Sequence, residues 1–183
     1  MTKSLLLIAF FQLLVNDIVM SAGRRDSVIV SGQYSLLGSW VTTEGFLHGN
    51  QLIHKYGVEI EYWRADGISP ILATNFHEVV YSATNGFVSY RGFSGYNINL
   101  GVQKEIPAEL RKFNNVGAAF CCFNFDRFNY TQQYEVYPSV ICRFGIENRS
   151  KIPFTLFLPI EYSFRQSGSY LSVGLTVQLG IKL

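Results

Sequence analysis

Hydrophobic and polar residues alternate along the last segment of the chain, residues 170–183. Every odd position from Leu171 to Leu183 is aliphatic, and the even positions between them are small or polar. A period of two residues is typical of a β-strand whose two faces have different surroundings. The apolar face could lie against the core of a sandwich or against the lipid around a membrane barrel.

Similar alternation divides the rest of the chain into further segments. Asn85-Gly86 predicts a tight hairpin turn, because these residues readily adopt the backbone that such a turn requires. On the segment that begins near residue 115, we place Val116, Ala118, Phe120 and Cys122 on the outer face. We predict eight strands. The first three cover about 27–41, 51–63 and 72–83, and the fourth follows Asn85-Gly86 and alternates clearly only over 96–103. The last four cover about 115–126, 134–147, 152–164 and 170–183.

The lengths of these segments and the positions of their charges favour a membrane barrel. Strands of about ten or more residues are long for a globular protein but suit a tilted membrane strand. The apolar faces of the five clearest strands carry no formal charge, and His54 is the one side chain in them that could become charged near neutral pH. We therefore predict a network inside the lumen formed by Lys55, Glu59, Glu61, Glu135, Arg143, Glu161 and Lys182.

Aromatic residues lie at the ends of the apolar faces, as the girdle of a membrane barrel requires. Trp40 and Phe164 are expected at one rim. Tyr62, Phe144 and Phe154 are expected at the other rim.

The start of the chain has the features of an export signal. Lys3 is followed by an apolar run over 5–15, and Ser21-Ala22-Gly23 offers small residues for a signal peptidase. The run is too short to span a bilayer as a helix. We predict a signal peptide over 1–23 and one barrel domain over 24–183.

These features together resemble the small outer-membrane barrels of double-membraned bacteria, of the OmpX, OmpW and OmpA-domain type. Ser172-Val173-Gly174-Leu175-Thr176-Val177-Gln178-Leu179 fits the insertion signal in the last strand of that family. This chain departs from the family by ending on Leu183 rather than an aromatic residue, and by its short connections. The resemblance implies a closed eight-stranded antiparallel transmembrane β-barrel, an outer-membrane location, contact with outer-membrane lipid, and recognition of the C-terminal strand by the barrel-assembly machinery.

Composition adds few candidates for other chemistry. The net charge of +2 and the scattered Lys and Arg residues predict no nucleic-acid partner. His48, His54 and His77 lack metal-ligand spacing, so we expect no metal or cofactor. Cys121, Cys122 and Cys142 cannot all pair within the chain, and we interpret them as small apolar residues on strands. His77, Glu78 and Ser82 cannot converge from one face of a strand, so we expect no enzyme.

Several functions remain open at this point. A structural or surface-interaction barrel requires a filled lumen, and eight strands leave little more room than their own side chains need. A narrow pore for small or apolar solutes requires an apolar trough, for which the inward candidates are Ile29, Leu37, Ile53, Trp63, Ile141 and Phe157. The alternatives are an exported lipocalin-like ligand-binding barrel, with charges outside, and an outer-membrane lipid-modifying hydrolase.

Overall fold

The computed structural model describes residues 27–43, 46–64, 66–84, 87–90, 93–106, 113–129, 131–148, 150–166 and 168–183. The predicted signal peptide over 1–23 lies outside these ranges. Within them the chain is all β, and no helix is long and apolar enough to cross a membrane. The strands are β1 (Ser27–Thr43), β2 (Phe46–Trp63), β3 (Ile68–Thr84), β4 (Phe87–Tyr90), β5 (Phe93–Ile106), β6 (Asn114–Phe128), β7 (Tyr134–Asn148), β8 (Phe154–Arg165) and β9 (Gly168–Lys182).

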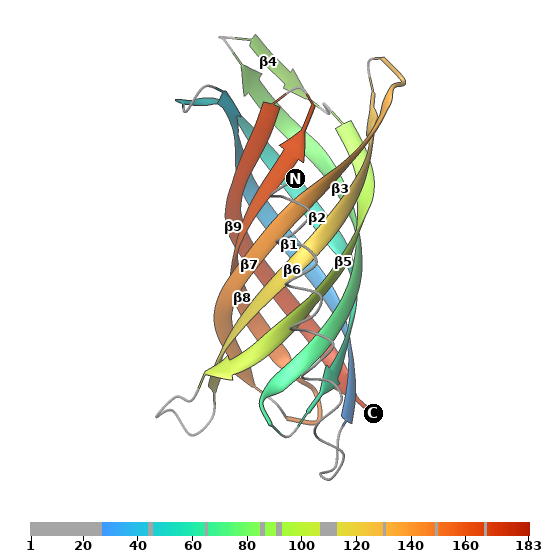
Figure 1. The fold of residues 1–183 in the computed structure, drawn as a ribbon, viewed down its shortest axis with the longest axis vertical. Coiled ribbons are helices and arrows are strands. Elements are labelled where there is room, and N and C mark those ends of the chain that lie inside the picture. Colours follow the sequence, from blue (N-terminus) through green and yellow to red (C-terminus); the bar gives the residue numbers. More distant parts are fainter. Residues whose placement is uncertain are drawn as a thin grey trace, which may run out of the picture.

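Eight of these strands close into an antiparallel barrel (Figure 1). Each long strand pairs with the next, and β9 pairs with β1, so the predicted closure of the last strand on the first is confirmed. β4 lies outside the ring and pairs with the end of β3. We call the end at which β4 lies the upper end, as in Figure 1. At the lower end, Leu183 N donates to Val28 O (2.8 Å).

The predicted eight-stranded barrel is confirmed, but the described part of the chain has one additional strand, β4, and several bounds differ from the prediction. The segment after Asn85-Gly86 forms two strands, β4 and β5, because the upper end of β3 extends beyond the barrel wall and pairs with β4. β2 and β3 begin several residues earlier than predicted. β8 begins at Phe154 rather than at residue 152, directly after Pro153, which has no N–H to donate to a neighbouring strand.

The strands are strongly staggered around the barrel. Following directly opposed residues from Ser31 of β1 through β2 and the other strands returns to β1 at Val41, ten residues further up. Such a stagger requires strands that are tilted from the barrel axis. Rows of opposed side chains therefore climb towards the upper end from β1 to β9.

The faces of most strands are as predicted. On β9, Thr176 and Gln178 are buried in the lumen, whereas Leu175 and Val177 are exposed on the outside. The outer wall is mostly apolar and most of the charged strand residues lie inside, which is the reverse of what a lipocalin-like barrel requires. The chain therefore has the outer surface of a membrane barrel.

The predicted outer face of β6 is wrong. Its even-numbered apolar residues are all buried in the lumen, at 7% exposure or less: Val116, Ala118, Phe120 and Cys122. One of two apolar clusters inside the barrel includes Ala118, Phe120 and Cys122, together with Ile71 and Ile141. The second cluster joins Leu37, Ile53, Val79 and Phe93. Three of the six predicted trough residues lie in these clusters: Leu37 and Ile53 in the second, and Ile141 in the first.

Candidate functional site

The lumen is filled by polar and charged side chains that form clusters at three levels. The lowest cluster centres on Arg143 of β7. Its Nη1 and Nη2 donate to the two carboxylate oxygens of Glu59 (2.7 and 2.6 Å), and Nη2 also donates to Gln103 Oε1 (3.1 Å). The guanidinium lies 4.6 Å from the ring centroid of Phe120 and 4.0 Å from that of Phe157. Arg143 is therefore held by a bidentate ion pair between two aromatic rings.

The middle cluster is an ion pair between Lys55 of β2 and Glu161 of β8. These strands are far apart around the barrel, so the pair crosses the lumen. Both side chains are buried, and Ser163 Oγ donates to the second oxygen of Glu161 (3.4 Å). The pair spans the lumen at mid-height.

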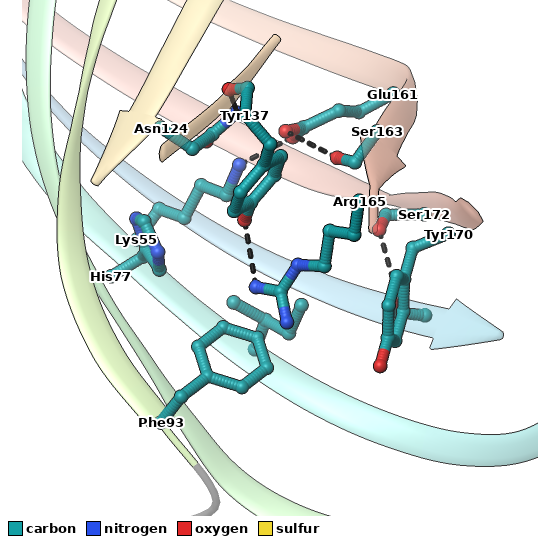
Figure 2. Close-up of a pocket in the computed structure, with 12 residues that line it drawn as sticks. Lys55, His77, Phe93, Asn124, Tyr137, Glu161, Ser163, Arg165, Tyr170 and Ser172 are labelled. Atoms are coloured by element: carbon teal, nitrogen blue, oxygen red, sulfur yellow. Dashed lines mark hydrogen bonds and ion pairs between the residues drawn. The ribbon is translucent and has the colours of Figure 1, made fainter. Parts of the chain in front are cut away.

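The upper cluster centres on Asp126 of β6, which is fully buried. His77 Nε2 lies 2.6 Å from Asp126 Oδ1, and Tyr137 Oη donates to Oδ2 (2.9 Å). Arg165 forms an ion pair with Asp126, and its guanidinium lies 4.1 Å from the centroid of the Phe93 ring. Figure 2 shows Arg165 reaching across the lumen among these aromatic side chains.

A lumen-facing glycine makes room for a contact that skips a strand. Gly95 of β5 is opposed to both His77 and Asp126, which lie on the strands at either side of it. A Cβ at Gly95 would lie 2.8 Å from Asp126 Oδ1 and 2.2 Å from Phe125 O. The bare backbone at Gly95 thus allows the contact between His77 and Asp126.

A ladder of side-chain amides follows the row of opposed residues below the upper cluster. The ladder begins at Gln178 of β9, which donates to Gln33 (2.9 Å), and Gln33 donates to Asn75 (2.6 Å). Asn75, Asn97 and Asn124 continue it, and Asn124 donates to Ser139 Oγ (2.6 Å). Buried amide groups need hydrogen-bond partners, which apolar side chains cannot supply. Here the side-chain amides bind one another along the inside of the wall.

Two small cavities lie between the three clusters. The upper cavity is lined by Arg165, His77, Lys55 and Glu161, and the lower one by Arg143, Lys55 and Glu161. The centre of a water molecule could occupy about 20 Å³ in the upper cavity and about 40 Å³ in the lower. The pair of Lys55 and Glu161 therefore separates two spaces that suit water or a small ion.

The structure places five of the predicted network residues together in the lumen, buried at 8% exposure or less: Lys55, Glu59, Glu61, Arg143 and Glu161. Glu135 lies instead near the upper rim, where its Oε1 accepts a hydrogen bond from Gln166 N (2.9 Å). Lys182 lies near the lower rim, with Nζ 3.9 Å from the centroid of the Trp63 ring. Both are half-buried and stand apart from the three clusters.

The predicted girdle residues all lie on the outer wall. Trp40 and Phe164 are near the upper end, and Tyr62, Phe144 and Phe154 are near the lower end. Phe144 is 55% exposed, and Trp40 is half-buried. Two cysteines share this wall, Cys121 and Cys142, whereas Cys122 is buried in the lumen, and all three are free thiols.

The upper cluster and the amide ladder were not predicted from the sequence. His77, Asp126 and Arg165 share the lumen-facing parity of their strands, but only the register between strands brings them together. His77 faces the lumen and Glu78 faces outward, so these two side chains do not form a common site. In the part of the chain that the structure describes, no group of His, Cys, Asp and Glu has an arrangement that could hold a metal ion.

No protein-family model matches the chain, and the comparison with curated proteins finds no relative. Solved structures do match. The crystal structure of Neisserial surface protein A has a TM-score of 0.61 and 10% sequence identity, and the match covers 87% of this chain and 100% of that one. The outer-membrane protein OprG from Pseudomonas aeruginosa has a TM-score of 0.50 and 10% identity, over 86% and 95% of the two chains. With its closed ring, apolar outer wall and charged lumen, the chain has the fold of the small eight-stranded bacterial outer-membrane β-barrels.

Proposed function

We propose that the protein is an integral outer-membrane barrel with a closed lumen, and that its role is structural or is exercised at its surface rather than by catalysis or bulk transport. The observation that carries this proposal is the set of three charged clusters that cross the lumen at successive levels. A buried ion pair that loses one partner leaves an uncompensated charge, so opening any one level is costly.

The upper end is assigned to the cell exterior in this proposal. In bacterial barrels the external connections are the more extended ones, and here β3 and β4 form a hairpin beyond the wall at the upper end. The lower end, where the C-terminal Leu183 lies, would then face the periplasm.

Conductance in planar bilayers tests the closed lumen. The purified protein is expected to give no channels, or very narrow ones. Lys55→Gln is the informative variant, because it opens the middle level while the clusters above and below it remain. A closed lumen predicts no gain in conductance, and a clear gain would overturn the proposal.

A second candidate function is passage of small apolar solutes sideways from the lumen into the bilayer. The observation that favours it is a gap in the pairing of β8 with β9: Phe157 and Ile160 are paired, but Leu158 and Pro159 between them are not. Pro159 has no N–H to donate, and it also lines the lower cavity. Pro159→Ala would restore a donor at this point. If solutes leave here, the variant should slow the uptake of an apolar dye into vesicles that contain the protein, whereas Pro138→Ala on β7 should not.

A further inference from the structure

The outer wall carries a row of aromatic side chains that crosses four strands. Tyr56, Phe76, Tyr96 and Phe125 are directly opposed to one another on β2, β3, β5 and β6. The ring centroids of Tyr56 and Phe76 are 5.2 Å apart, and those of Tyr96 and Phe125 are 4.9 Å apart and nearly parallel. Tyr96 is 52% exposed. The row therefore presents a continuous aromatic surface to the surroundings of the barrel.

A polar row lies directly above this aromatic surface, two residues further up each strand. Glu78 of β3, Ser94 of β5, Arg127 of β6 and Tyr134 of β7 are opposed to one another in register. Arg127 is exposed and Glu78 is half-buried on the outer wall. Of the described residues of the upper half of the barrel, Arg127 is the one Lys or Arg on the outer side of a strand.

On β5 and β6 the two rows lie where the apolar wall ends, because β5 begins at Phe93 and β6 ends at Phe128. One row below the aromatic surface the residues on β5 and β6 are Ile98 and Phe123, and apolar side chains continue below them. Trp40 lies near the same end of the barrel, as an interfacial aromatic residue does. Any molecule held by both rows must have an apolar part below and a polar head above.

The chemistry of the two rows selects the kind of head. Flat aromatic rings can stack against the C–H faces of sugar rings, and a row of several rings matches several sugars better than the single phosphate of a phospholipid. The Arg127 guanidinium can form paired hydrogen bonds with a phosphate. The Glu78 carboxylate and the hydroxyls of Ser94 and Tyr96 can bind sugar hydroxyl groups.

We propose that this aromatic–polar face, formed by Phe76, Tyr96, Phe125, Glu78, Ser94 and Arg127, binds the head group of a phosphorylated glycolipid of the outer leaflet. The proposal rests on the proposed orientation of the upper end towards the cell exterior. It does not depend on whether the lumen is closed.

Titration of the folded full-length protein in detergent with lipid A, and separately with phosphatidylglycerol, tests the proposal. Native mass spectrometry gives the bound fraction for each lipid. Arg127→Gln and Tyr96→Leu are expected to weaken lipid A binding about ten-fold, the loss that one charged hydrogen-bonding partner or one stacking platform produces. Lys104→Gln and Phe144→Leu are the matched controls, because they remove an outward cation and an exposed aromatic ring near the lower end.

Three results would overturn the proposal. The first is lipid A binding no tighter than phosphatidylglycerol binding, and the second is equal losses in the Arg127 and Lys104 variants. The third is unchanged lipid A binding in Arg127→Gln, Tyr96→Leu and Glu78→Gln. Conductance is measured on the same preparations. A protein that conducts but still prefers lipid A would contradict the proposed closed lumen and leave the lipid proposal standing.

Discussion

Gly57 lies between Gln33 and Asn75 in one row of opposed residues, and Gln33 donates to Asn75 Oδ1 (2.6 Å) across its bare backbone. A Cβ at Gly57 would lie 2.5 Å from that oxygen and 2.0 Å from Thr74 O. The amide ladder can therefore pass over β2 only because position 57 has no side chain. Glycine here serves a close approach between strands.

Gly57→Ala is expected to lower the free energy of unfolding by about 3 kcal/mol, because the new methyl group overlaps backbone atoms that cannot move away without disturbing β3. Gly32→Ala is the matched control, since a Cβ there meets nothing nearer than Leu179 O at 4.0 Å. Unfolding of both variants in urea, followed by the fluorescence of Trp40 and Trp63, gives the comparison. Similar stability of the two variants would contradict the tight approach at Gly57.

Arg143→Gln is expected to destabilise the barrel by about 3–5 kcal/mol, because it leaves the buried Glu59 carboxylate without its cation. Glu59→Gln should cost a similar amount, and the double variant less than the sum of the two. A double-mutant cycle in vesicles measures this coupling. Independent, additive losses would mean that the bidentate pair is not formed in the membrane.

Asp126→Asn should destabilise the upper cluster by about 3–5 kcal/mol, because Arg165 then lacks a buried counter-charge. Glu135→Gln is a suitable comparison, because Glu135 accepts one hydrogen bond near the rim and its loss should cost about 1 kcal/mol. The fraction of heat-resistant folded barrel on gel electrophoresis ranks the two variants. Equal losses would show that Asp126 contributes no more than a rim carboxylate does.

Val140→Arg is expected to cost about 2–4 kcal/mol, because Val140 is on the outer wall of β7 near the middle of the apolar band. Tyr134→Arg, on the same face of the same strand but near the upper end, should cost about 0–1 kcal/mol. The efficiency of folding into lipid vesicles tests the difference. Tolerance of both substitutions would argue against lipid around this wall.

Alternation predicted the faces of β7 and β9 because one parity of each strand is almost entirely apolar and the other carries most of its polar residues. On β6 it failed, since Ala119, Cys121 and Phe123 on one face are as apolar as Val116, Ala118 and Phe120 on the other. The polar residues Asn124 and Asp126 lie on the same face as Phe120, and they indicate that this face is the lumen side. Partners such as Lys55 and Glu161 could not be paired from the sequence, because their contact depends on the stagger of strands that are far apart along the chain.

The alternation of inward and outward side chains makes the wall intolerant of changes in strand length. Because faces alternate with every residue, deleting one residue within β7 would turn either the segment above it or the segment below it inside out. Arg143 or Glu135 would then point towards lipid, and Val140 or Phe144 towards the lumen. The neighbouring strands could not follow, since each is held in register on both sides. Insertions and deletions in this protein should therefore be confined to the connections at the two ends of the barrel.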